Sequence, residues 1–191
     1  MSNRVGIVLL CEDARHEQFI REFLRQKGRF ARRVFPDGYK RRVPGGAKPN
    51  NSFVVGRAPQ EIKEARVAPP KRALVIVIDG DTRGYASRCG EIARELKAQK
   101  MAALGDKERI ALVIPCRNIE TWIHHFRGNE TNETEEFGSF YPKATYDALP
   151  QAQAFADFVS DGAAAEVADL PALDAARGEL RRLNELMKQS P

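Results

Sequence analysis

An apolar run that ends in two carboxylates constrains the fold of this chain more than any other feature. The stretch Ala73-Leu-Val-Ile-Val-Ile-Asp-Gly-Asp81 has six consecutive apolar residues, four of them Val or Ile, and then two acids separated by one glycine. A strand that is apolar on both faces is typical of the centre of a parallel sheet. Open α/β sheets bind ligands beyond the carboxyl ends of their strands, so we expect Asp79 and Asp81 to lie at such a site.

The two acids allow two interpretations. Carboxylates this close together repel each other unless a positive charge compensates them, and a hard cation such as Mg2+ is a common solution in proteins. The alternative is structural, with Asp79 capping the next helix and Asp81 forming a turn.

Two further apolar runs complete the prediction of the fold. Residues 5–10 form the first run, which ends at Cys11-Glu12, and residues 110–114 form the third. Helical spacing follows the first run, with Phe19 and Phe23 on one face, and it recurs after Asp81 and over residues 171–188. We therefore predict an α/β fold in which strands near 5–10, 73–78 and 110–114 are parallel neighbours with helices on both faces. Glu12 then lies at the same sheet edge as Asp79.

Charge is distributed unevenly along the chain, which has 191 residues, a net charge of +5 and a pI of about 9.2. Residues 29–57 contain eight Lys or Arg and one acid, whereas residues 129–170 contain nine acids and one Lys. Turn signals dominate residues 29–71, although 30–35 and 52–55 resemble short strands and 59–66 a short helix. The aromatic residues between the cations suit base stacking. We predict phosphate contacts from six residues: Arg32, Arg33, Lys40, Arg41, Arg42 and Lys48. The alternative is a solvated basic surface whose aromatics belong to the core.

The segment after the third strand supplies further candidates. Asn118 is a plausible N-cap, which places Glu120 in the first turn of a short helix. Glu120 is then either a surface acid that favours the helix dipole or a carboxylate directed at the site. Glu17 allows the same two roles. Lys143 either stabilises the charge of a bound phosphate or pairs with a neighbouring acid.

Several short motifs, taken in order, resemble the TOPRIM fold. The motifs of the TOPRIM fold itself are Val-Leu-Leu-Cys-Glu12, Glu17 and Ile-Asp79-Gly-Asp81. A small bacterial TOPRIM-related family has motifs similar to three further segments: Ile114-Pro-Cys-Arg-Asn-Ile-Glu120-Thr-Trp122, Tyr141-Pro-Lys143 and the closing Leu-Asp-Ala-Ala-Arg-Gly-Glu-Leu-Arg-Arg-Leu helix. TOPRIM domains occur in topoisomerases, primases, OLD-family nucleases and small bacterial RloB-like proteins. Asp13 stands where these proteins usually have glycine, and it either adds a charge near the site or points away from it.

The resemblance implies a TOPRIM-like Rossmannoid domain at 1–127 with a basic insertion at about 29–71. Residues 128–191 would form an acidic loop and a helical C-terminal extension on the same domain. It also implies a nuclease that uses Mg2+ or Mn2+ to cleave nucleic acid, in bacterial anti-phage defence or DNA repair beside an ATPase partner. Glu12, Asp79, Asp81 and Glu120 would hold metal, and Glu12 and Lys143 would act in catalysis.

Two other functions remain open at this stage. One is a non-catalytic nucleic-acid-binding or regulatory subunit that keeps the fold. The other is a phosphatase of the haloacid dehalogenase type, although Arg83 stands where its Asp-x-Asp-x-Thr motif has threonine. No apolar run reaches transmembrane length and no signal peptide is recognisable, so we expect a cytoplasmic protein without a membrane partner. The three cysteines lack CxxC spacing, which favours neither a disulfide framework nor a zinc site.

Overall fold

The computed structural model describes residues 5–26, 34–37, 50–68, 72–141, 149–161, 167 and 169–189. The strands in these ranges are β1 (Val5–Cys11), β2 (Val34–Asp37), β3 (Arg72–Val77) and β4 (Ile110–Val113). The helices are α1 (Ala14–Leu24), α2 (Asn51–Val67), α3 (Gly84–Ala98), α4 (Ile119–His125), α5 (Leu149–Ser160) and α6 (Pro171–Lys188), with a 3-10 turn, η2 (Gly138–Phe140).

The strands form one four-stranded sheet in the order β2-β1-β3-β4. Every neighbouring pair is parallel, with Leu9 opposite Val75 and Val75 opposite Ala111. The prediction of three parallel neighbours is therefore confirmed. The connection from β1 to β2 contains α1, which lies on one face of the sheet, whereas the connection from β3 to β4 contains α3, which lies on the other face. The carboxyl ends of β1 and β3 consequently flank the point where the strand order reverses, which is where open α/β sheets form their crevice.

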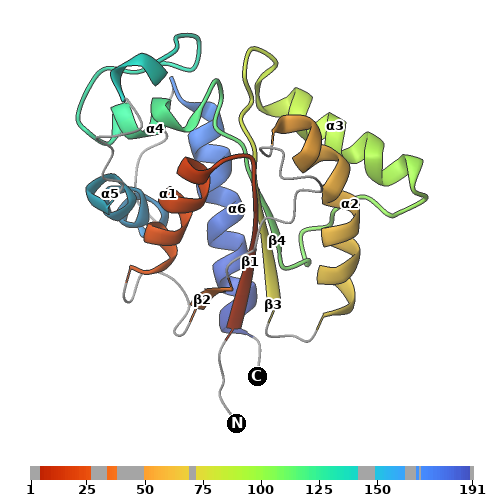
Figure 1. Cartoon of the computed structure of the whole chain (residues 1–191). Coiled ribbons are helices and arrows are strands. Elements are labelled where there is room, and N and C mark those ends of the chain that lie inside the picture. Colours follow the sequence, from red (N-terminus) through yellow and green to blue (C-terminus); the bar gives the residue numbers. More distant parts are fainter. Residues whose placement is uncertain are drawn as a thin grey trace.

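Helices cover both faces of the sheet, as predicted (Figure 1). Alternate residues of each strand point to opposite faces. Leu9, Val75 and Val113 face the layer that contains α1, α4, α5 and α6. Leu10, Ile76 and Leu112 face the layer that contains α2 and α3. The chain thus has an α/β fold with three layers and a buried parallel sheet in the middle.

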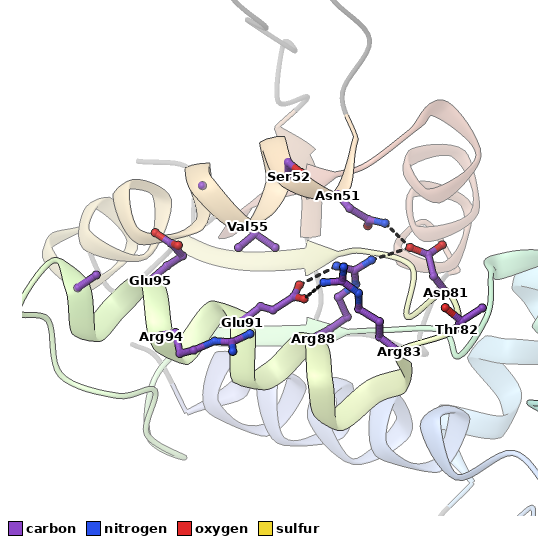
Figure 2. A pocket seen from close by; sticks show the side chains of 12 residues that line it. Asn51, Ser52, Val55, Asp81, Thr82, Arg83, Arg88, Glu91, Arg94 and Glu95 are labelled. Atoms are coloured by element: carbon purple, nitrogen blue, oxygen red, sulfur yellow. Dashed lines mark hydrogen bonds and ion pairs between the residues drawn. The ribbon is translucent and has the colours of Figure 1, made fainter.

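The layer of α2 and α3 also contains an open pocket (Figure 2). The two helices pack against each other on this face of the sheet. Between them lies a cavity of about 970 Å³, which reaches from Asn51 at the start of α2 to Ala98 at the end of α3. Asp81 and Arg88 are among the residues that line it. One acid of the Asp-Gly-Asp motif therefore faces this pocket.

The sequence prediction for residues 51–67 is wrong, because these residues form one helix rather than a strand followed by a short helix. The Asn50 side chain caps α2 by accepting a hydrogen bond from the Phe53 amide at 2.9 Å. Val54, Ala58 and Ile62 recur every four residues and are fully buried, which is helical spacing. Pro59 lies inside the helix rather than at its first turn. Tertiary packing and the Asn50 cap therefore outweigh the strand preference of Val54 and Val55 and the preference of Pro59 for the first turn of a helix.

The predicted strand at 30–35 overlaps β2 only at its end, and residues 30–33 lie outside the described ranges.

No helix within the described ranges is long and apolar enough to cross a membrane.

Candidate functional site

The site begins where β1 and β3 end. Glu12 directly follows β1, and its backbone N–H donates to the Val77 carbonyl at 3.2 Å, which continues the ladder between the strands. Asp79 follows β3 by two residues, and its backbone N–H donates to Oε2 of Glu12 at 3.1 Å. Parallel pairing therefore brings together two acids that are 67 residues apart in the sequence. The predicted proximity of Glu12 and Asp79 matches this arrangement.

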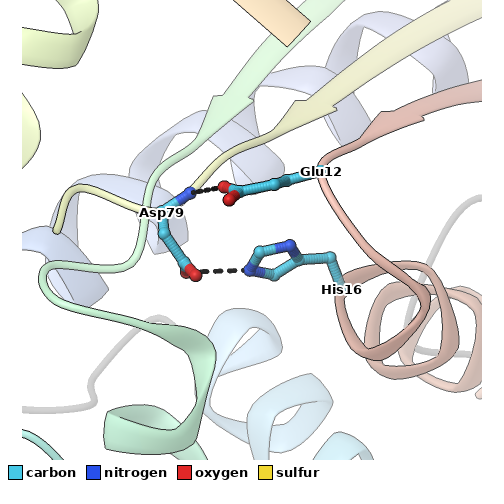
Figure 3. A group of neighbouring side chains, drawn as sticks. All are labelled: Glu12, His16 and Asp79. Atoms are coloured by element: carbon cyan, nitrogen blue, oxygen red, sulfur yellow. Dashed lines mark hydrogen bonds and ion pairs between the residues drawn. The ribbon is translucent and has the colours of Figure 1, made fainter. Parts of the chain in front are cut away.

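The first turn of α1 adds a histidine to the two acids. Asp13 is the N-cap of α1, and its Oδ1 accepts hydrogen bonds from the amides of Arg15 and His16 at 2.8 and 3.0 Å. This cap fixes the start of the helix. The His16 side chain points toward Asp79 (Figure 3). His16 is completely buried. Asp13 therefore orients His16 as the cap of its helix, and it also places a negative charge beside the imidazole.

Glu12, His16 and Asp79 form a compact cluster (Figure 3). One side-chain ligand atom from each residue lies within 4.8 Å of the others, and this is the candidate metal-binding group in the described part of the chain. His16 Nε2 lies 2.8 Å from Oδ1 of Asp79. His16 Nδ1 lies 3.4 Å from Oδ1 of Asp13 and has no hydrogen-bond partner among the described residues. The cluster thus combines one imidazole with two carboxylates.

Burial and charge shift the protonation equilibria of the cluster. Burial, together with the negative charge of Asp79, raises the pKa of Glu12 from 4.5 to about 7. Burial on its own lowers the pKa of His16, but attraction to Asp79 and Asp13 outweighs it and raises the pKa to about 9. His16 is therefore an imidazolium at neutral pH, and it supplies a positive charge that compensates the acids.

The shifted pKa of His16 predicts how stability depends on pH. Because the pKa is higher in the folded state, the stabilisation is complete below pH 6.5 and is lost as pH rises to about 9. One pKa unit is worth about 1.4 kcal/mol, so deprotonation of His16 should lower the free energy of unfolding by about 3 kcal/mol across this window, and the raised pKa of Glu12 adds to the fall up to about pH 7. Urea unfolding at pH 6 and pH 9 measures the fall. His16→Gln should show a clearly smaller decrease, and an equal decrease in both proteins would contradict this assignment.

Asp81 departs from the predicted arrangement, because its carboxylate lies apart from the Glu12–His16–Asp79 cluster. Its Oδ2 accepts hydrogen bonds from Arg88 Nη2 at 2.6 Å and from Asn51 Nδ2 at 2.5 Å. The backbone explains this direction, because Asp81 has a left-handed φ of 48° and pairs with Arg117 in an isolated bridge. Its charge still contributes to the raised pKa of Glu12.

Glu120 forms an ion pair between two helices and is not part of the Glu12–His16–Asp79 cluster. Asn118 caps α4, as predicted, by accepting a hydrogen bond from the Thr121 amide at 3.2 Å. Glu120 is buried in the first turn and forms an ion pair with Arg15 of α1. Arg15 also donates to the Tyr141 carbonyl. The Glu120 carboxylate therefore joins α4 to α1 next to the cluster instead of extending it.

The remaining predicted residues lie outside the described ranges. They are Lys143 and the six cations Arg32, Arg33, Lys40, Arg41, Arg42 and Lys48. Their roles stay predictions. Glu17, for which two roles were open, forms an ion pair with Arg21 one turn later, with Nη2 and Oε1 2.7 Å apart.

His16 is the site residue that sequence reasoning missed, although the sequence contains a signal for it. His16, Phe19, Ile20 and Phe23 share one helical face, and this face is the buried one. A polar residue at the start of a buried stripe, one turn after a strand end, points toward the carboxyl edge of the sheet.

No protein-family model, no curated protein and no solved structure matches this chain. The cluster and its position at the sheet edge therefore carry the functional argument.

Proposed function

We propose that this chain is a Mg2+-dependent nuclease of the TOPRIM type that cleaves phosphodiester bonds in nucleic acid. One observation carries the proposal. Glu12 and Asp79 follow adjacent parallel strands, and their side chains converge with His16 within 4.8 Å at the edge of the sheet where such folds bind ligands.

The chemistry of the donor set fits Mg2+ or Mn2+. Mg2+ in enzymes is commonly held by one or two carboxylates, while waters and substrate phosphates complete its coordination. Glu12 and Asp79 would supply these two carboxylates. His16 would act from behind Asp79, because its imidazolium already donates to Oδ1 at 2.8 Å. A hydrogen bond to a ligating carboxylate orients that ligand, which is the role we assign to His16.

The bound ion would neutralise phosphate charge and lower the pKa of a bound water. Residues of the chain would supply the remaining functions. Glu12, next to the ion, would also accept a proton from the attacking water. His16 holds Asp79 in place. By the resemblance, Lys143 would stabilise charge on the scissile phosphate.

The basic segment extends the proposal to substrate binding, and salt dependence tests it. Each phosphate neutralised by the protein releases counterions, with a log–log slope of about −0.9 on duplex and −0.7 on single strands. Replacing Lys40, Arg41 and Arg42 with alanine should therefore flatten the slope by roughly two to three. Fluorescence anisotropy over a salt series measures this. An unchanged slope and affinity in the triple variant would mean that these residues do not contact the nucleic acid.

The resemblance also suggests the biological setting. It favours bacterial anti-phage defence or DNA repair, with an ATPase as protein partner. Co-purification of an ATPase with the tagged protein would support this part of the proposal.

A second candidate function is a non-catalytic nucleic-acid-binding or regulatory subunit with the same fold. It is favoured by the fact that cations of the chain already compensate the acids. His16 forms an ion pair with Asp79 and Arg88 forms one with Asp81, to which the neutral Asn51 amide also donates a hydrogen bond. Such a network can stabilise a fold without any metal.

A cleavage assay distinguishes the two candidates. The protein is incubated with single-stranded and duplex DNA and RNA in Mg2+, in Mn2+ and in EDTA. We expect cleavage of at least one substrate that depends on the metal ion. Binding without cleavage of any substrate in either metal would favour the non-catalytic subunit.

A further inference from the structure

Arg88 is a buried arginine that donates hydrogen bonds to the Asp79-Gly80-Asp81 turn and to the helix that follows it. Its exposed fraction is 5%. The guanidinium donates from Nε to the Asp79 carbonyl at 2.9 Å, from Nη2 to Oδ2 of Asp81 at 2.6 Å and from Nη1 to Oε2 of Glu91 at 2.6 Å. Figure 2 shows Arg88 between the carboxylates of Asp81 and Glu91. All three sides of the guanidinium fork are therefore used.

The backbone of the turn is held independently on its other side. The Gly80 amide donates to the Pro115 carbonyl at 2.7 Å, and the Asp81 amide donates to the Arg117 carbonyl at 3.0 Å. A Cβ on Gly80 would lie 3.0 Å from the Pro115 oxygen, so the turn packs closely against the segment after β4. Because the main chain is fixed, Asp81 can reach the cluster only by rotating its side chain away from Arg88.

That rotation would be unfavourable while Arg88 is present. Removing one partner of a buried, charge-assisted pair leaves the other charge poorly compensated. Arg88 would keep only Glu91 as a carboxylate partner, and Glu91 is already shared with Arg83 at 2.6 Å. The Asp81 carboxylate is half exposed, so it keeps much of its hydration while it lies in the pocket.

We propose that Arg88 is a positioning residue for the metal centre: it retains the Asp81 carboxylate in the pocket between α2 and α3, so that the cation is held by Glu12 and Asp79 without Asp81. This inference rests on the proposed metal-dependent function. It assigns the two acids of one motif to different tasks, Asp79 to the cation and Asp81 to the structure of the turn.

Mn2+ binding, measured by calorimetry on the full chain, tests the inference. Asp81→Asn should change the dissociation constant by less than about threefold, because its carboxylate is not a ligand. Arg88→Gln frees the Asp81 carboxylate, and an added carboxylate should tighten Mn2+ binding about tenfold. The double variant should return to the wild-type constant. A merely structural role for Arg88 predicts the opposite sign, namely weaker binding in Arg88→Gln. Arg94→Gln, on the same helix and pocket, is the matched control and should bind Mn2+ as the wild type does.

Two results would overturn this inference without affecting the proposed function, provided that Asp79→Asn abolishes Mn2+ binding. The first is a loss of at least about tenfold in Mn2+ affinity in Asp81→Asn. The second is Mn2+ binding in Arg88→Gln that is unchanged or weaker. If Arg88→Gln does not fold, the Asp81→Asn result decides on its own. Wild-type protein that binds no Mn2+, or binding that is insensitive to Asp79→Asn, would instead overturn the proposed function and this inference with it.

Discussion

Asp79→Asn is expected to lower the rate of Mg2+-dependent cleavage by about 100- to 10,000-fold, because the charge stabilisation supplied by a bound metal is worth several kcal/mol. Asn keeps an oxygen that can accept the hydrogen bond of His16, but it removes the negative charge that would hold the cation. Single-turnover cleavage of a labelled oligonucleotide measures the effect.

The choice of Asn over Ala follows from His16. Repulsion between neighbouring acids, considered on its own, predicts that removing one carboxylate affects the fold little. The structure corrects this expectation, because Asp79→Ala would leave a buried imidazolium without its closest acceptor. Asp106→Asn is a matched control on an exposed acid before β4, at the opposite edge of the sheet. Equal losses in both variants, or undiminished cleavage in Asp79→Asn, would contradict the mechanism.

Phe155→Ala should destabilise the protein by about 3–5 kcal/mol, the usual range for removing a buried aromatic ring. Phe155 of α5 is fully buried, and its ring centroid lies 5.4 Å from Phe19, 5.0 Å from Phe23 and 5.6 Å from Trp122. The substitution therefore removes the contacts that join α5 to α1, the helix that carries His16.

Urea unfolding monitored by circular dichroism measures the loss in stability. Phe158→Ala is the control, because Phe158 lies on the same helix but is only partly buried, and its loss should be clearly smaller. A change below about 1 kcal/mol in Phe155→Ala would show that α5 does not pack on α1 as described.

The parallel core was predictable because its strands are buried on both faces. Such strands require continuous apolar runs, and residues 73–78 and 110–114 have almost no other interpretation. Helix α6 was equally clear, since its proline start and leucine stripe agree with each other. Helix α2 was not predictable in the same way. Its Val54-Val55 pair and Pro59 favour other structures locally, and the helix depends on the Asn50 cap and on the burial of Val54, Ala58 and Ile62 against α3 and the sheet.

The part of the candidate site that lies at strand ends was predictable from the sequence. Glu12 and Asp79 follow adjacent strands, so parallel pairing alone brings them together. The direction of Asp81 depends on a left-handed backbone conformation and on Arg88, and neither follows from the spacing of the two acids. The burial of Glu120 depends on Arg15, which comes from a distant helix. His16 was overlooked because it lies on a helix rather than at a strand end.

The most direct test of the central claim is a crystal structure of the protein soaked in Mn2+, in which anomalous scattering locates the ion. We predict one strong anomalous peak at the carboxyl edge of the sheet, in contact with carboxylate oxygens of Glu12 and Asp79. His16 should remain hydrogen-bonded to Asp79. A peak bound elsewhere on the chain, or no peak at the cluster at a saturating Mn2+ concentration, would contradict the assignment of this cluster as a metal centre.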